Sequence, residues 1–233
     1  MYEAVHARPD GASTVARQAL TAADYGYDGI VVRNHVDERA TYDAETVAGE
    51  YGIDVVTGVE VRADAPAQAS GHVGNARSSQ TIVAVHGGDA EMNRFAVEQP
   101  TVDVLAHPMR ADGDFNHVLA AAAAENGVRV EFSLARVLRE EGGRRVRTIQ
   151  ALRKLRELVA DADAPYVVSA DPFSHLQIRA PRELVAVGET IGFDADAVRD
   201  GLAEWGRLAE RNRDRRSDAF VEPGVRIDET DEE

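Results

Sequence analysis

Seven short apolar runs recur along the chain with amphipathic segments between them, and this repetition narrows the possible folds more than any other feature. The runs cover residues 2–7, 29–34, 54–61, 81–87, 102–108, 128–134 and 166–171. Most of them are continuously apolar rather than alternating, which is typical of strands covered on both faces. Strands of this kind form parallel sheets whose connections are helices. The repetition therefore predicts an α/β protein.

The segments between the runs have helical features. Segments 13–26 and 116–127 end on Gly26 and Gly127, and glycine suits the left-handed position that follows many helices. A last helix is expected from Asp194, and its buried face is predicted to contain Val198, Leu202, Trp205 and Leu208. Since no clean eighth strand is found, the repeats predict an imperfect TIM-type barrel with about seven parallel strands. A doubly wound open sheet is the alternative, although no glycine-rich dinucleotide fingerprint follows a strand.

The length of 233 residues suits a single barrel domain. We expect this domain to cover residues 1–216, followed by an acidic tail at 217–233 that is predicted to be disordered. No apolar run is long enough to span a membrane and no signal peptide begins the chain, so we expect a cytoplasmic protein with no membrane partner. The absence of cysteine excludes disulfides, thiolate metal sites and a cysteine nucleophile.

The chain is strongly acidic and almost free of lysine. Its 26 basic and 41 acidic residues give a net charge of −15, and Lys154 is the single lysine. This charge alone argues against a nucleic-acid partner. An acidic, lysine-poor composition also suits a salt-filled cytoplasm, and at molar salt the Debye length is only about 3 Å. We therefore expect a halophilic protein, in which local charge is a better guide to partners than net charge.

Polar side chains gather where the predicted strands end. In a parallel barrel the functional residues lie at the carboxyl ends of the strands and in the loops that follow. Six of the seven histidines, all but His72, fall at strand ends or strand-to-helix positions. The residues of this predicted rim are His6, Asn34, His35, Glu60, Arg62, His86, His107, Glu131, Asp171, Ser174 and His175. Each histidine alone is explained by a bond to a loop carbonyl, but together they predict a shared functional face.

One candidate for this face is a metal-dependent phosphoesterase. Glu60 in GVEVRA, His107 before Pro108, and the late Asp171 resemble motifs of the polymerase-and-histidinol-phosphatase superfamily. That superfamily opens with His-x-His and ends its second strand in Thr-Asp-His, whereas this chain has Ala4 before His6 and reads Arg33-Asn34-His35. An arginine beside a metal site suits phosphate oxygens better than it suits a neighbouring cation. The alternative function is thus a stand-alone phosphoesterase whose metal ligands are His6, His35, Glu60, His107 and Asp171.

Three longer stretches carry a more specific resemblance. VAVHGGDAEMNRFAVEQPTVDVLAHP, NHVLAAAAAENGVRVEFSL and PYVVSADPFSHLQIRAPRELVAVGETIG resemble the ribonuclease P protein component 3 family in order and spacing, over about residues 2–200. The resemblance implies a barrel related to the phosphoesterases that acts as a protein cofactor of a ribonucleoprotein. In that particle RNA-bound Mg²⁺ removes the 5′ leader of precursor tRNA. It also implies that this chain has no catalytic residue and no cofactor of its own.

The implied partners follow from the same resemblance. They are the ribonuclease P RNA, ribonuclease P protein component 2, the other protein subunits and the precursor tRNA. In this setting arginines are expected to neutralise phosphates and position the RNA.

A local excess of positive charge fits an RNA partner. Residues 136–157 contain eight basic and three acidic side chains, so the segment carries 8 − 3 = +5. A solvated helix with Glu–Arg pairs is the simpler explanation, but the excess favours phosphate contact. Apolar Val146, Ile149, Leu152 and Leu155 are predicted to face the barrel. The candidate RNA-binding residues are Arg144, Arg147, Arg153, Lys154, Arg94, Arg179, Arg182 and Arg33.

The sequence HGGD at residues 86–89 predicts a tight turn from a strand into a helix. Gly87 and Gly88 supply the conformational freedom that such a turn needs, and Asp89 is placed to cap the helix that carries Arg94. His86 is then a structural or RNA-facing histidine rather than a metal ligand. Together with Ser174 and His175, His86 and Asp89 are predicted rim residues.

Overall fold

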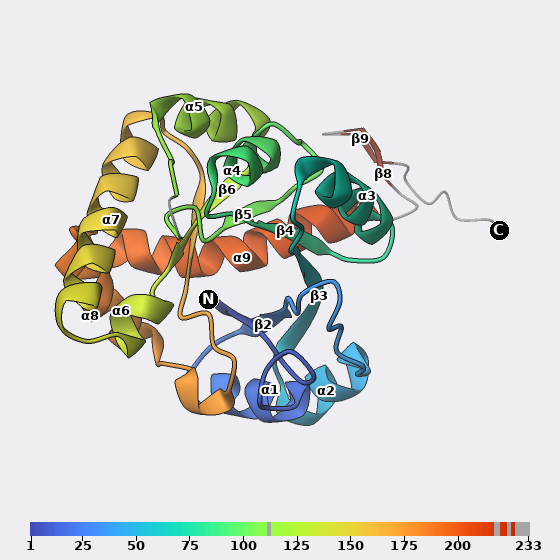
Figure 1. Ribbon diagram of the computed structural model, residues 1–233. Helices are drawn as coiled ribbons and strands as arrows, with labels where there is room; N and C mark the ends of the chain where they lie inside the picture. Colours follow the sequence, from blue (N-terminus) through green and yellow to red (C-terminus); the bar gives the residue numbers. More distant parts are fainter. Residues whose placement is uncertain (111–112, 217–219, 223–224, 227–233) are drawn as a thin grey trace.

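Seven parallel strands form one sheet in which each strand pairs with the next along the chain. The computed structural model describes the chain except residues 111–112, 217–219, 223–224 and 227–233 (Figure 1). The strands are β1 (Tyr2–Val5), β2 (Gly29–Val32), β3 (Asp54–Val61), β4 (Ile82–His86), β5 (Val104–Ala106), β6 (Arg129–Ser133) and β7 (Tyr166–Ser169). Each lies within one predicted run, which confirms the imperfect α/β barrel. Among the described residues no ladder joins β7 to β1, so the barrel is nearly closed.

Helices surround the sheet (Figure 1). They are α1 (Val15–Asp24), α2 (Ala44–Tyr51), α3 (Pro66–Arg77), α4 (Ala90–Val97), α5 (His117–Asn126), α6 (Ala135–Arg139), α7 (Gly142–Asp161), α8 (Pro181–Ile191) and α9 (Ala195–Arg215), with a 3₁₀ turn η1 (His175–Gln177). The predicted glycine after α5 adopts the left-handed conformation, since Gly127 has φ 65°. No described helix is long and apolar enough to cross a membrane.

The inner face of the sheet changes character along the strands. Its apolar part consists of Ala4, Val31, Val56, Ile82, Ala84, Val104 and Val167, together with Trp205, Leu208 and Ala209 of α9. Side chains two apart on a strand share a face. His6 follows Ala4, Arg33 follows Val31 and His86 follows Ala84 at this spacing. The amino-terminal half of the interior is therefore apolar, and the carboxyl-terminal half carries the polar residues of the predicted rim.

Helix α9 covers the amino-terminal ends of the strands. Its polar side chains bind residues at or just before strand starts: Glu204 accepts from Arg129 at 2.7 Å, Arg213 donates to Asp54 at 2.8 Å, and Asn212 donates to Asp103 at 2.9 Å. The Trp205 side chain projects into the interior and has 0% of its surface exposed. The buried face predicted for the last helix is confirmed: Trp205 and Leu208 pack into the interior of the barrel, and Val198 and Leu202 pack in the other, larger hydrophobic cluster.

Side chains bridge the gap between β7 and β1. The Glu3 carboxylate accepts from the backbone N–H of Ala170 at 3.0 Å, and the Trp205 indole donates to the carbonyl of Val168 at 3.0 Å. Burial raises the pKa of Glu3 to about 8, although its hydrogen bonds oppose the shift. Backbone groups of β7 that an eighth strand would satisfy are thus bonded to side chains.

Val146 was predicted to face the barrel, and the structure shows that this is wrong, because its side chain is 54% exposed. Residues 141–147 are all exposed, so the first turns of α7 extend beyond the packed part of the helix. Further along the same helix, Leu152 and Leu155 are buried as predicted.

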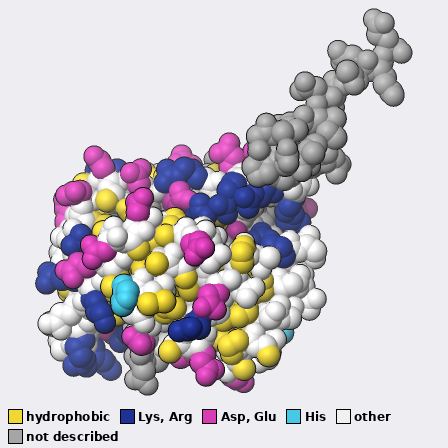
Figure 2. Space-filling model, turned by 90° about the horizontal axis from the view of Figure 1, so that it is seen from above, with side chains coloured by type: hydrophobic (Ala, Val, Ile, Leu, Met, Phe, Trp, Pro, Cys, Tyr) yellow, Lys and Arg dark blue, Asp and Glu magenta, His cyan; other side chains and the backbone are white. Residues whose placement is uncertain are grey.

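The predicted tail at 217–233 contains a described two-stranded antiparallel sheet, β8 (Phe220–Glu222) with β9 (Val225–Arg226), and its other residues lie outside the described part of the chain. On the face seen in Figure 2, acidic side chains are interspersed with basic and apolar ones. On that face the acidic residues are scattered and do not form a single patch.

Candidate functional site

The carboxyl-terminal end of the barrel, here termed the mouth, brings together polar residues from the ends of all seven strands. His6, His35, Glu60, His107 and Asp171, the ligands of the phosphoesterase alternative, all lie there. Arg33, His86 and Glu131 join them from β2, β4 and β6. Asp10, which sequence reasoning missed, lies in the loop after β1 and contacts both His6 and His35. Its position four residues after a strand-end histidine was the signal that could have found it.

Arg33 lies at the centre of the mouth. Its guanidinium nitrogens lie 2.7 Å from Glu131 Oε1, 2.9 Å from Asp171 Oδ1 and 3.1 Å from Glu60 Oε2. Burial alone would lower the pKa of Arg33, but the attraction of Glu131, Glu60 and Asp171 outweighs burial and raises it. Arg33 was predicted to contact RNA phosphate, and the structure corrects this. The side chain is 0% exposed and its charge is already paired within the mouth.

Asp10 connects two of the histidines. His6 Nδ1 lies 2.7 Å from Asp10 Oδ2, and His35 Nδ1 lies 2.9 Å from the same oxygen. Burial would lower the pKa of His35, but its hydrogen bonds to Asp10 and Glu60 raise it to about 9. At neutral pH His35 is therefore cationic. Phe173 covers this pair on one side, since its ring stacks on His6 with centroids 4.1 Å apart.

Glu60 receives contacts from several imidazoles as well as from Arg33. His86 Nδ1 is hydrogen-bonded to Glu60 Oε1, and His107 Nε2 lies 3.5 Å from the same oxygen. Burial would raise the pKa of Glu60, but Arg33 and His107 hold it well below its usual range. Arg110 Nη1 lies 3.2 Å from His86 Nε2, so that nitrogen accepts from arginine while Nδ1 donates to Glu60. In this arrangement the His86 ring is neutral, because one of its nitrogens donates and the other accepts.

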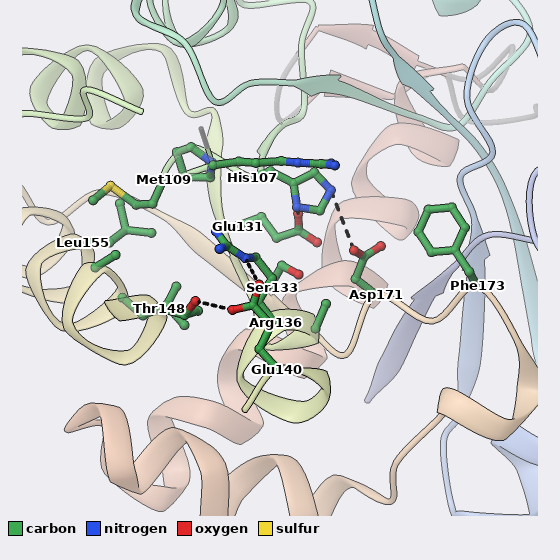
Figure 3. Close-up of a pocket in the computed structure, with 15 residues that line it drawn as sticks. His107, Met109, Glu131, Ser133, Arg136, Glu140, Thr148, Leu155, Asp171 and Phe173 are labelled. Carbon is green, nitrogen blue, oxygen red and sulfur yellow. Dashed lines mark hydrogen bonds and ion pairs between the residues drawn. The ribbon is translucent and has the colours of Figure 1, made fainter. Parts of the chain in front are cut away.

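A pocket opens beside the mouth, between the end of β6 and helices α6 and α7 (Figure 3). Its volume is about 610 Å³, and His107, Glu131 and Asp171 line its inner end. Leu152 and Leu155 of α7 form an apolar wall. At the outer side Glu140 accepts from Arg136 at 2.9 Å and from Thr148 at 3.0 Å. The pocket therefore joins the buried polar mouth to the surface near α7.

The metal-site alternative requires carboxylates and imidazoles that are free to surround a divalent ion. Here the oxygens of Glu60, Glu131 and Asp171 surround the Arg33 guanidinium instead. A positive charge at that point repels a second cation and fills the space it needs. The residues present therefore do not fit the metal site of the phosphoesterase superfamily.

The predicted surface candidates lie outside the mouth. Arg144, Arg147, Arg153 and Lys154 are exposed on α7, and Arg94 and Arg182 are exposed on α4 and α8. Arg153 donates to the carbonyl of Thr190 at 2.7 Å, and Arg179, which is half-buried, donates to the carbonyls of Leu176 and Ile178. These two side chains are partly engaged in holding the fold.

The predicted turn at residues 86–89 is confirmed. Gly88 has φ 109°, and a Cβ on Gly87 would lie 2.3 Å from the amide oxygen of Asn93. Asp89 caps α4 by accepting from the N–H of Met92 at 2.9 Å. The other two rim candidates serve a loop: Ser174 caps η1, and His175 Nδ1 lies 2.8 Å from Ser13 Oγ. Of His86, Asp89, Ser174 and His175, His86 alone reaches the mouth cluster.

Two solved structures share this fold. One is a chain of archaeal ribonuclease P with mature tRNA, which superposes with a TM-score of 0.82 at 23% identity and covers 100% of both chains. The other is histidinol phosphate phosphatase from Lactococcus lactis, with zinc, L-histidinol and phosphate. It superposes with a TM-score of 0.56 at 12% identity and covers 82% of this chain and 94% of the phosphatase. At sequence identities of 23% and 12%, both structural similarities are evidence for the fold alone.

Sequence relatives narrow the assignment. Ribonuclease P protein component 3 of Haloarcula marismortui is 70% identical over 229 residues, covering 98% of this chain and 97% of that protein. Its counterpart from Natronomonas pharaonis is 67% identical over 233 residues, covering 100% of this chain and 98% of that protein. The family model described as RNase P subunit p30 matches residues 1–217. The chain therefore belongs to the ribonuclease P subunit p30 family.

Proposed function

We propose that this chain acts as protein component 3 of ribonuclease P in the cytoplasm. It binds the catalytic RNA together with a partner subunit, protein component 2, and stabilises the fold in which RNA-bound Mg²⁺ removes the 5′ leader of precursor tRNA. Its arginines neutralise phosphates and orient the RNA, and no residue of the chain takes part in the chemistry. Family membership supports this role, since the relatives carry the name of that subunit.

The exposed cations of α7 carry the proposal. Arg144, Arg147 and Lys154 are exposed, and within the described part of the chain none of them forms an ion pair or a side-chain hydrogen bond. Exposed cations without an ion pair or side-chain hydrogen bond, spread along one helix, are unusual in a chain of net charge −15. A solvated helix in such a protein gains more from pairing its arginines with the abundant carboxylates. Phosphates are the anions that these cations suit best.

The phosphoesterase alternative lacks support in the geometry of the mouth. Its metal ligands are all present and close together, but Arg33 takes up the carboxylate oxygens that a metal ion needs. A phosphoesterase of this type depends on a metal ion to activate its water. We therefore assign no hydrolytic step to this chain.

Reconstitution tests the proposal. Ribonuclease P assembled from its RNA and protein subunits should cleave precursor tRNA faster with this chain than without it. The tagged protein, recovered at high salt from its own cells, should carry ribonuclease P RNA. An unchanged cleavage rate and a preparation free of nucleic acid would contradict the proposal. Turnover of a phosphodiester with Mn²⁺ or Zn²⁺, lost in His107→Ala, would favour the phosphoesterase instead.

A further inference from the structure

Three buried carboxylates of the mouth converge on the Arg33 guanidinium, Glu131 and Asp171 at Nη2 and Glu60 at Nη1. Glu60 comes from β3, Glu131 from β6 and Asp171 from the loop after β7, and each places an oxygen within 3.1 Å of the Arg33 guanidinium. Glu60 is 0% and Glu131 is 1% exposed. Carboxylates buried this deeply stay ionised only beside a cation. The point where they converge is a cation position, and a side chain of the protein occupies it.

An imidazole completes the surroundings of this position. His6 Nε2 lies 3.2 Å from Asp171 Oδ1 and 3.7 Å from Glu60 Oε2, and the His6 side chain is 0% exposed. Ligand atoms of a metal ion bound at about 2.1 Å lie about 3–3.5 Å from one another. The spacing of His6, Glu60 and Asp171 is close to that range. Three carboxylates and one imidazole form a donor set suited to Mn²⁺.

The Arg33 guanidinium is held at this position from the opposite side. Its central carbon lies 5.6 Å from the centroid of the Trp205 ring, on the buried side chain of α9. The Trp205 ring contacts the guanidinium, and the carboxylates bind its terminal nitrogens. Arg33 is therefore a fixed part of the mouth.

We propose that Arg33 is a built-in cation in the place of a divalent metal ion, and that removing its guanidinium converts the mouth into a Mn²⁺ site formed by His6, Glu60, Glu131 and Asp171. Truncation to alanine removes the guanidinium that pairs with all three carboxylates and leaves the imidazoles of the mouth as their remaining positive neighbours. A divalent ion supplies both the charge and the volume.

Metal binding by Arg33→Ala, compared with wild type, tests this directly. Free Mn²⁺ is measured by electron paramagnetic resonance in concentrated potassium chloride, where wild type gives the background from surface carboxylates. Arg33→Ala should bind about one additional Mn²⁺ ion per chain, and stoichiometric Mn²⁺ should raise its Tm by on the order of 10 °C over the value in EDTA. Arg33→Ala/Glu131→Gln should lose the additional ion.

Two further variants separate the cation position from a general effect of arginine loss. Arg62→Ala removes an arginine that is 47% exposed just after β3, and it should bind Mn²⁺ as wild type does. Arg33→Lys keeps a cation and should also show no additional ion. The proposal is overturned if wild type binds the same ion as tightly as Arg33→Ala. It is equally overturned if Arg33→Ala folds without binding the ion, or if Mn²⁺ fails to restore its fold.

Discussion

The guanidinium of Arg33 lies over the indole of Trp205, with 5.6 Å between its central carbon and the ring centroid. Arg33 directly follows the second strand, and Trp205 comes from the last helix of the barrel. A buried cation over an aromatic face is attracted by about 2 kcal/mol or more when both groups are desolvated. This contact joins the polar half of the interior to the apolar half, so α9 contributes to the arrangement of the mouth although it lies at the opposite end.

Trp205→Ala should therefore lower the free energy of unfolding by about 3–5 kcal/mol, the usual cost of removing a large aromatic side chain from a core. The substitution also leaves the carbonyl of Val168 without its indole donor. Urea denaturation in concentrated potassium chloride measures the change. Leu176→Ala serves as the control, because Leu176 is 74% exposed and its truncation should change the free energy by less than about 0.5 kcal/mol. Similar effects of the two substitutions would show that Trp205 does not anchor the interior.

Arg144→Gln/Arg147→Gln should weaken RNA binding without changing the fold. The logarithm of the binding constant falls linearly with the logarithm of the salt concentration. Each lost phosphate contact reduces the steepness of this dependence by about 0.9, so the slope of the double variant should be less steep than that of wild type by about 1.8. The weakening should be similar for RNAs of different sequence. Affinity for ribonuclease P RNA over a salt series is the measurement. The control is Arg17→Gln/Arg199→Gln, which removes two exposed arginines from α1 and α9.

A slope shared by wild type and the α7 double variant would show that this helix face is merely solvated. Arg94 and Arg182 would then be the next exposed candidates.

Stability should fall as pH rises through the titration of Glu3. The pKa of this buried carboxyl is about 8 in the folded chain against 4.5 ordinarily, so between these values the folded state binds a proton that the unfolded state has released. The stabilising contribution is complete below the ordinary pKa and is lost as pH approaches 8. The loss amounts to at most about 1.4 kcal/mol per pH unit.

Glu3→Gln cannot titrate and isolates this effect. Its free energy of unfolding, measured by denaturant at intervals from pH 5 to pH 9, should fall less steeply than that of wild type. Parallel curves for the two proteins would mean that Glu3 titrates normally in the folded chain.

Folding should require high salt. A net charge of −15 on a domain of this size produces mutual repulsion that salt screens, and the halophilic relatives of this chain have closely similar sequences. Circular dichroism over a potassium chloride series should show structure lost at low ionic strength. Equal stability in dilute buffer would contradict the halophilic explanation of the composition.

Much of the fold could be predicted because parallel strands leave a clear mark in the sequence. Because these strands are buried on both faces, their sequences are continuously apolar, and each strand lies within one of the predicted apolar runs. The convergence of His6, Glu60, His107 and Asp171 followed from one geometric rule, that the carboxyl ends of parallel strands meet. The spacing of α9 likewise predicted which of its faces is buried, with Trp205 at its centre.

Other features depend on contacts between distant segments. Charged residues are almost never fully buried unless they are paired, so the sequence favours an exposed Arg33, and its burial depends on three carboxylates from distant segments. The helical spacing in α7 does not reveal where the helix leaves the barrel, and Val146 was therefore assigned to the wrong environment. The burial of α9 against the strand starts has no local signal, because an amphipathic pattern does not identify the surface it packs on.

The position of α9 also bears on how the protein is made. Residues 195–215 supply the side chains that fill the barrel interior, yet they are the last part of the domain to leave the ribosome. Until then the inner faces of β1–β7 have no apolar cover and the strand starts lack their polar partners. A nascent chain that has completed all seven strands therefore still exposes an incompletely filled interior until Trp205 arrives.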